Sequence, residues 1–178
     1  MKKLLLVTSM LFSAFAASAQ KHSPQSYIDE FKEYAIRIMH ETGVPASVIL
    51  GVAMHESGCG NSALAKNLNN QFGVKGSGHI TYVTKKKTVR TAYKRYGSVY
   101  DSFQDFARIM TERTEFNALA QKFPHFDYNG WALGIAHHGY ASDPSWAKSV
   151  LGIIKKYQLY TFDENPQNQQ PVVTAQGN

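Results

Sequence analysis

The segment from Val44 to Gly58 places the strongest limit on what this chain can fold into. Pro45 suits the start of a helix, and Gly58 suits its end. Between them the sequence is mostly apolar, with Val48, Ile49, Val52 and Ala53 as the main apolar positions. A helix that is apolar on nearly every side must be buried, so the rest of the chain has to pack around it.

The length allows one core of this kind. The chain has 178 residues, which is enough to bury a single core and too few for two ordinary domains. Hydrophobic residues make up 43% and charged residues 18%, a composition that excludes a disordered chain. The one cysteine, Cys59, excludes an intramolecular disulfide and a cysteine-ligated zinc cluster.

Residues 1–19 have the pattern of a signal peptide. Lys2 and Lys3 precede a short apolar run, and Ala17-Ser18-Ala19 fits a small-x-small cleavage site. That run is too short to span a membrane comfortably, and no other segment is apolar enough to do so. We therefore expect cleavage after Ala19 and export to the periplasm or the medium, without stable membrane insertion. A retained N-terminal anchor is the alternative.

The net charge predicts an anionic partner. The whole chain carries +6, and removing Lys2 and Lys3 with the signal leaves +4. A small basic protein favours polyanions, and export argues against nucleic acid as the partner. Acidic material of the cell wall remains. The charge is also uneven, because no Asp or Glu occurs between Glu56 and Asp101 while residues 85–87 are all lysine.

Helical signals occupy most of the chain. Ser23-Pro24 and the pair Ser98 and Asp101 are typical helix starts, the second resembling a capping box. Start and stop signals of this kind predict helices over 23–43, 45–58, 62–68, 98–110, 115–122, 128–138 and 143–157. In this scheme Asp143 is the N-cap of the last helix. The apolar stripes place Phe103, Phe106 and Trp146 in the core.

Residues 73–96 have a different pattern. Glycines cluster at 73, 76 and 78, and then Ile80, Tyr82, Val89, Thr91 and Tyr93 alternate with polar residues. A period of two predicts strands, which residues 85–87 would connect. The sequence therefore predicts a mainly α, α+β domain over 20–162 with a small β-hairpin lobe. The Asn- and Gln-rich residues 163–178 predict a disordered polar tail.

Glu56 is the strongest candidate for chemistry. It stands at the C-terminal end of the apolar helix, where the helix dipole disfavours an anion. Apolar surroundings disfavour the charged form further, and both effects favour the protonated carboxyl that a general acid needs. A solvated or salt-bridged surface glutamate is the alternative interpretation.

Other chemistries have less support. Cys59 stands where a zinc-protease helix needs its second histidine after His55, and His137 and His138 point about 100° apart on a helix. We therefore expect no metal and no other cofactor. Cys59 also has no evident catalytic partner, which disfavours a cysteine nucleophile. Tyr140 falls in a tight loop between two expected helices, where it either flanks a cleft or caps the core.

Three stretches together resemble the bacterial cell-wall glucosaminidases of glycoside hydrolase family 73, the mannosyl-glycoprotein endo-β-N-acetylglucosaminidase-like domains. Residues 44–58 resemble the family's catalytic helix, which ends in its acid glutamate. Residues 68–76 resemble its Asn-rich Phe-Gly-Ile-Lys segment, and residues 139–147 its Gly-Tyr-Ala-Thr-Asp-Pro signature. Residues 93–106 also match its run into the central helix, so the resemblance covers about residues 25–160.

The resemblance implies a lysozyme-like fold and hydrolysis of the β-1,4 bond after N-acetylglucosamine in peptidoglycan. It implies that Glu56 is the general acid and that Tyr140 lies beside the reacting sugar. The positions that it implies for substrate contacts are Asn70, Phe72, Lys75, Tyr82 and Asp143. On this basis we expect a monomer that acts on peptidoglycan glycan strands.

Two positions depart from the family pattern. Many members carry a second carboxylate in a Thr-Glu-Tyr segment of the β-lobe, where this chain has Ile80-Thr81-Tyr82, and Cys59 stands where members often have Trp. Two-carboxylate glycosidases need the second group as base or nucleophile. Three alternatives follow: the substrate's own N-acetyl group attacks, Asp101 or Asp105 reaches the cleft, or the enzyme is weak.

Other functions also fit these residues. A lytic transglycosylase or a muramidase would use the same Glu56, and a transglycosylase would tolerate the missing carboxylate. The remaining alternative is an inactive peptidoglycan-binding module, in which the basic residues 85–87 hold anionic wall material.

Overall fold

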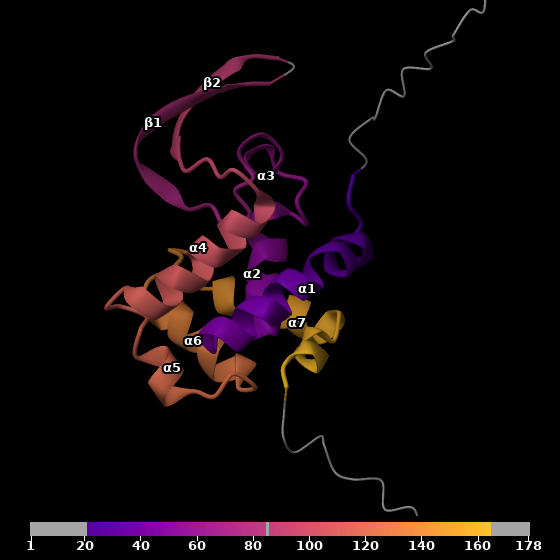
Figure 1. The fold of residues 1–178 in the computed structure, drawn as a ribbon, viewed down its shortest axis with the longest axis vertical. Helices are drawn as coiled ribbons and strands as arrows, with labels where there is room; N and C mark the ends of the chain where they lie inside the picture. The colour runs from indigo at the N-terminus through magenta and orange to yellow at the C-terminus, as the bar shows by residue number, and fades with distance from the viewer. Residues whose placement is uncertain (1–20, 85, 165–178) are drawn as a thin grey trace, which may run out of the picture.

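The apolar segment forms the central helix of the protein. In the computed structural model, which describes residues 21–84 and 86–164, helix α2 (Ala46–Ser57) is buried from Ala46 to Met54. It packs mainly against α1 (Pro24–Thr42) and α7 (Trp146–Lys156), as Figure 1 shows. The prediction of a buried helix surrounded by the rest of the chain is confirmed. The predicted signal peptide, residues 1–19, lies outside the described residues.

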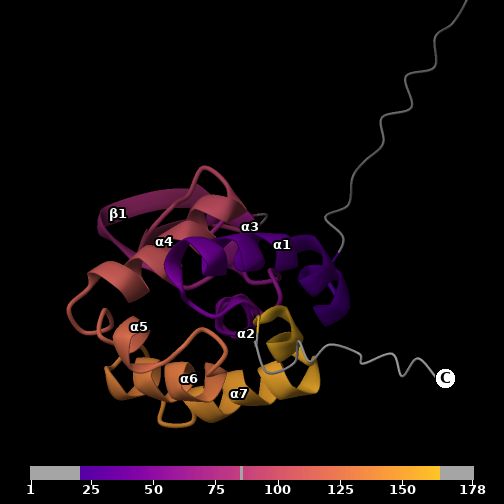
Figure 2. The ribbon, with the colours of Figure 1, turned by 60° about the horizontal axis from the view of Figure 1, so that its bottom comes forward.

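The remaining helices complete the layers around α2. Figure 2 shows α1 and α4 (Val99–Glu112) on one side of it and α6 (Tyr128–His137) and α7 on the other. Two short helices are α3 (Ala63–Leu68) and α5 (Leu119–Lys122), the second of which begins four residues later than the start predicted near 115. Within the described residues, no helix has both the length and the apolar character that a membrane crossing requires.

Local capping explains where several helices begin and end. Ser23 and Ser26 form a capping box at the start of α1, and Ser98 and Asp101 form the predicted one at the start of α4. Gly43 and Gly58 adopt the left-handed conformation that terminates α1 and α2. These four boundaries therefore follow the signals read from the sequence.

Helix α7 begins two residues later than predicted, with Ser145 in place of Asp143 at its N-cap position. Asp143 is not its N-cap: the Asp143 side chain accepts hydrogen bonds from the backbone N–H and the hydroxyl of Ser145, both at 2.8 Å. This local turn competes with a helical start, as aspartate side chains often do. The helix begins at Trp146, and the Asp143 carboxylate stays at the surface.

The folded domain extends beyond its predicted limit at residue 162. A 3-10 helix, η1 (Leu159–Phe162), was not predicted; it buries Leu159 and packs against α2. Asp163, assigned to the polar tail from the sequence, is 5% exposed. Its carboxylate accepts hydrogen bonds from the backbone N–H and the hydroxyl of Ser47, in the first turn of α2, at 2.9 and 2.5 Å. Residues 165–178 of the predicted tail lie outside the described residues.

The predicted β-hairpin lobe is present. Strands β1 (Lys75–Val83) and β2 (Thr88–Tyr93) pair antiparallel, with Ile80 opposite Thr91 and Tyr82 opposite Val89. The pairing is irregular between Lys75 and Ile80, in the glycine-rich part of β1. Figure 1 shows the hairpin projecting from the helices beside α3, so the predicted mainly α, α+β fold class is confirmed.

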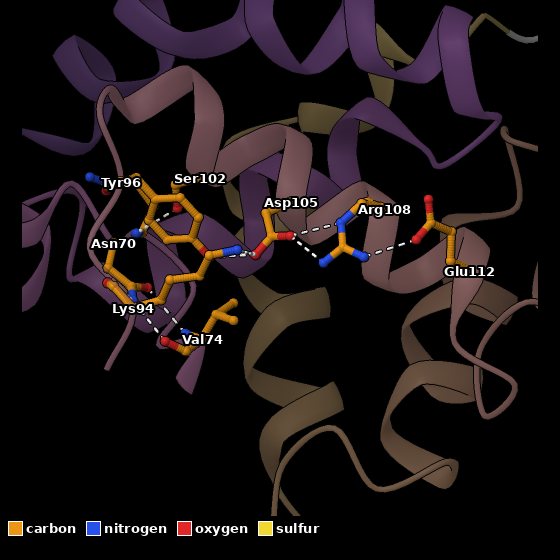
Figure 3. A network of polar contacts seen from close by, with 9 residues as sticks. Asn70, Val74, Lys94, Tyr96, Ser102, Asp105, Arg108 and Glu112 are labelled. Atoms are coloured by element: carbon orange, nitrogen blue, oxygen red, sulfur yellow. Dashed lines mark hydrogen bonds and ion pairs between the residues drawn. The ribbon is translucent and has the colours of Figure 1, made fainter. Parts of the chain in front are cut away.

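A polar network fastens the root of this lobe to α4 (Figure 3). Asn70 accepts a hydrogen bond from the Val74 backbone N–H and donates to the carbonyls of Val74 and Lys94, which joins the two chain segments that enter and leave the lobe. Asp105 of α4 accepts from the Lys94 ammonium at 2.9 Å, the Tyr96 hydroxyl at 2.7 Å and the Arg108 Nε at 2.9 Å. The lobe is therefore tied to α4 through one carboxylate.

A glycine controls the contact between α2 and α7. A Cβ added at Gly51 would stand 2.8 Å from the Cγ1 of Ile154 and 3.4 Å from the Cγ1 of Val150, both of which are fully buried. Real side chains do not tolerate the shorter distance, so the close approach of the two helices depends on this glycine. The crossing brings the C-terminal end of α2 next to the start of α7.

Candidate active site

A cleft of about 600 Å³ opens where the lobe, α2, α4 and the loop between α6 and α7 meet. Its walls come from residues 55–56 at the end of α2 and from residues 72–75 and Tyr93 of the lobe. The other walls come from residues 139–143 with Trp146, and from the C-terminal part of α4 with the segment after it: Ile109, Arg113 and Phe116. Segments that are far apart in the sequence thus meet in one concave site. Clefts of this volume are typical of ligand-binding sites.

Glu56 lies in this cleft and is half-buried. Its Oε1 accepts a hydrogen bond from the indole N–H of Trp146 at 2.7 Å. Within the described residues it forms no salt bridge, so the alternative of a salt-bridged surface glutamate is not what the structure shows. The carboxylate is held by a neutral donor at the wall of a cleft, an arrangement that suits proton transfer to a bound substrate.

Trp146 is a site residue that the sequence interpretation missed, as are Tyr93 and Arg113, which also line the cleft. The apolar stripe of α7 placed it in the core, and the side chain is indeed only 2% exposed. A buried indole still needs an acceptor for its N–H, and here that acceptor is Glu56. The periodicity that places a tryptophan in the core does not reveal where its N–H points.

Tyr140 combines the two placements that its loop position left open. It lines the cleft, and its ring packs against the core, 5.3 Å from the Trp146 ring and edge-on to Phe106 at 5.8 Å. Its hydroxyl donates a hydrogen bond to the carbonyl of Phe72 at 3.1 Å. Burial, together with the negative charge of Glu56, raises the pKa of Tyr140 well above its usual value, so the phenol stays protonated and acts as a donor.

Three of the five predicted substrate contacts line the cleft. Phe72 is 2% exposed and stacks on Phe106 with ring centroids 4.4 Å apart, so it forms the floor. Lys75 is exposed on the lobe wall, and Asp143 is exposed at the rim. Hydrogen bonds from the backbone N–H and the hydroxyl of Ser145 hold the pKa of Asp143 below its usual value, so this carboxylate stays charged.

The other two predicted contacts lie elsewhere. Asn70 is 1% exposed, and both its amide hydrogens and its oxygen are used at the root of the lobe. Tyr82 is buried within the hairpin. Neither side chain lines the cleft. The Asn-rich segment instead shapes the entry to the lobe.

The second carboxylate does not come from α4. Asp101 accepts a hydrogen bond from the Ser98 backbone N–H in the capping box, and Asp105 is occupied in the network below the lobe. Neither lines the cleft, so the alternative that one of them reaches the substrate is corrected. Among the described residues, the acids that line the cleft are Glu56 and Asp143.

Among the described residues, the cleft contains neither a metal-binding cluster nor a cysteine nucleophile. In the part of the chain that the structure describes, no three His, Cys, Asp or Glu side chains are close enough together to hold a metal ion. Cys59 is not among the cleft residues, and burial raises the pKa of its thiol, which disfavours the thiolate that a nucleophile requires.

The chain is similar in sequence to a known exo-glucosaminidase and to a known peptidoglycan hydrolase. The exo-glucosaminidase LytG of Bacillus subtilis is 33% identical in an alignment 154 residues long that covers 80% of this chain and 55% of LytG. The peptidoglycan hydrolase FlgJ of Vibrio parahaemolyticus is 26% identical in an alignment 173 residues long that covers 88% of this chain and 55% of FlgJ. The chain therefore spans about half the length of these curated relatives.

Solved structures show the same fold. A peptidoglycan hydrolase from Sphingomonas sp. A1 is 27% identical with a TM-score of 0.61, covering 78% of this chain and 92% of that one. The glycoside hydrolase domain of Salmonella typhimurium FlgJ is 21% identical with a TM-score of 0.62, covering 79% and 91%, and it supports the fold alone. The family model described as mannosyl-glycoprotein endo-β-N-acetylglucosaminidase matches residues 32–159. By sequence and by fold, this chain belongs to the Glucosaminidase family.

Proposed function

We propose that the protein is an exported peptidoglycan hydrolase that cuts the β-1,4 bond after N-acetylglucosamine, with Glu56 as the general acid. The observation that carries this proposal is the placement of Glu56 in the cleft, bonded to Trp146, in a chain of the Glucosaminidase family. The names of its relatives, an exo-glucosaminidase and peptidoglycan hydrolases, support the choice of bond and substrate. The protein acts on glycan strands as a monomer.

Glu56 performs the first proton transfer. Its carboxyl proton moves to the glycosidic oxygen as the bond from that oxygen to C1 breaks, so the departing sugar leaves as a neutral alcohol. Tyr140, protonated and anchored to the Phe72 carbonyl, keeps the wall beside the reacting sugar in place.

The second group in this proposal is the substrate's own N-acetyl group. Its carbonyl oxygen attacks C1 as the leaving group departs, which forms a cyclic oxazolinium ion. Water then adds to C1, the ring opens, and the water's proton passes to the Glu56 carboxylate. Asp143, the other cleft acid, supports this choice because Ser145 binds both of its oxygens and its lowered pKa makes it a weak base.

A digest of purified sacculi tests the activity. We expect fragments with a reducing N-acetylglucosamine end whose anomeric configuration is retained, because two displacements occur at C1. Borohydride reduction with mass spectrometry identifies the end, and NMR of the fresh products gives the configuration. A reducing N-acetylmuramic acid end would indicate a muramidase, and an anhydromuramic end a lytic transglycosylase. Binding without any product would indicate an inactive wall-binding module.

Export is the second part of the proposal, and it rests on residues 1–19. Their basic start, apolar run and Ala17-Ser18-Ala19 ending support secretion with removal of this segment. The protein recovered from the periplasm or the medium of expressing cells should begin at Gln20. Edman sequencing or mass spectrometry checks this, and an intact Met1 on the recovered protein would contradict it.

A further inference from the structure

The hydrogen bond from Trp146 makes the two oxygens of Glu56 inequivalent. An indole nitrogen only donates, so Oε1 of Glu56 must accept at 2.7 Å whether the carboxyl group is ionised or protonated. When Glu56 carries the acidic proton, that proton therefore resides on Oε2. The oxygen that delivers the proton is thus set by the structure before any substrate binds.

Oε2 faces the root of the β-lobe. It lies 3.8 Å from the point where a Cβ on Gly73 would stand, and Cε1 of Tyr93 lies 4.0 Å from the same point. Gly73 has a φ of 64°, a conformation that favours glycine, and it leaves this point free of any side chain. Oε2 therefore borders a part of the cleft that no side chain fills, next to Gly73 and between Glu56 and Tyr93.

Trp146 is buried beside Glu56, with only 2% of its surface exposed. It stands at the start of α7, which Gly51 brings into close contact with α2. Its ring lies 5.3 Å from Tyr140 and 6.5 Å, edge-on, from His55. A rigid donor of this kind restricts the Glu56 side chain to one orientation.

We propose that Trp146 is a positioning residue that keeps the acidic proton of Glu56 on Oε2 and directs it to the lobe side of the cleft. The scissile glycosidic oxygen then lies above Gly73, between Glu56 and Tyr93. This inference rests on the proposed role of Glu56 and adds which oxygen transfers the proton and from which side the substrate presents its leaving oxygen.

Other ionisable groups surround Glu56 but form no hydrogen bond with it in the described part of the chain. They come from α2, the lobe, the segment after α4 and the loop before α7: His55, Lys75, Tyr93, Arg113, Tyr140 and Asp143. Removing the Trp146 N–H therefore changes the hydrogen bonding of Glu56 and leaves the charges around it unchanged.

Replacing Trp146 with phenylalanine removes this donor and keeps an aromatic ring. We expect kcat on sacculus fragments to fall roughly 10-fold, as the loss of one hydrogen bond to a charged group predicts. We expect KM to change by less than about 3-fold, because the bond does not contact substrate.

Trp131→Phe is the matched control. Trp131 is also buried and also donates its indole N–H, at 3.2 Å to the carbonyl of Phe123, but it lies outside the cleft. Its kcat should stay at the wild-type value, whereas a purely structural effect would appear in both variants. An unchanged kcat in a folded Trp146→Phe protein would overturn the inference, and so would an equal fall in both variants.

A measurement on the unaltered protein removes the dependence on folding of the variant. The chain has two tryptophans, so a ¹⁵N-labelled sample gives two indole N–H signals. The Trp146 signal should titrate together with the alkaline limb of activity, and it should stop titrating in Glu56→Gln, while the Trp131 signal stays constant. No titration of the Trp146 signal would refute the inference even if Glu56→Gln is inactive; a fully active Glu56→Gln would instead refute the proposed function.

Discussion

Replacement of Glu56 by glutamine lowers the rate of peptidoglycan cleavage by about 10²- to 10⁴-fold, the usual contribution of a general acid. Glutamine has the same shape and can still accept the Trp146 N–H through its amide oxygen, but it carries no acidic proton. The cleft and its packing are therefore expected to persist, and the free energy of unfolding should change by less than about 1 kcal/mol.

The rate is measured as the release of soluble fragments from purified sacculi, and the stability as a thermal unfolding curve. Glu41→Gln is the matched control, because Glu41 is exposed near the end of α1 and lies outside the cleft. It makes the same charge change and should keep the wild-type rate. A folded Glu56→Gln protein that clears sacculi as fast as the control would end the proposal that Glu56 is the acid.

Replacement of Asp105 by asparagine should lower the free energy of unfolding at pH 7 by roughly 1–3 kcal/mol, the range for losing hydrogen bonds to a charged group. For a domain of this size that corresponds to about 3–10 °C in Tm. The side chains of Lys94 and Arg108 are 42% and 51% exposed, which keeps the effect below that of a fully buried ion pair. We also expect KM to rise, because the loosened lobe carries Lys75 and Tyr93 of the cleft wall.

The pH dependence identifies the cause. Burial opposes ionisation of Asp105, but hydrogen bonds from Tyr96, Lys94 and Arg108 outweigh it and hold its pKa below the usual value. The stabilisation is complete above about pH 4, the pKa of aspartate in an unfolded chain, and is lost as the pH falls through the folded pKa. Urea unfolding of both proteins between pH 7 and pH 3 should show the difference shrinking on acidification. A constant difference would assign the loss to packing.

Local signals allowed most of the fold to be predicted. The caps at Ser23 and Ser98 and the stops at Gly43 and Gly58 act within one helical turn, so the sequence contains them in full. The hairpin followed in the same way from alternation. Asp163 could not be placed, because its partner Ser47 is 116 residues away and nothing near either residue indicates the contact.

The site was predicted less completely, for a related reason. A sequence motif shows that a segment matters and does not show whether a side chain faces the substrate or supports the backbone. Asn70 belongs to the second class, since its amide joins the ends of the lobe. Trp146 belongs to neither class, because its indole N–H holds the Glu56 carboxylate, whereas its apolar stripe indicated only burial. The sequence also allows Asp101 or Asp105 as the second carboxylate, and only their local hydrogen bonds show that they are used elsewhere.

Gly51 influences the distance between the Glu56 carboxylate and its hydrogen-bond donor, Trp146. It lies five residues before Glu56, about 7.5 Å along the helix at 1.5 Å per residue, and it contacts Val150 and Ile154 on the helix that begins with Trp146. The spacing between α2 and α7 near the active site thus depends on the side chains of Val150 and Ile154 and on the lack of one at position 51. Changes at 51, 150 and 154 should consequently be non-additive, and any redesign of the acid's surroundings has to treat these positions as one unit.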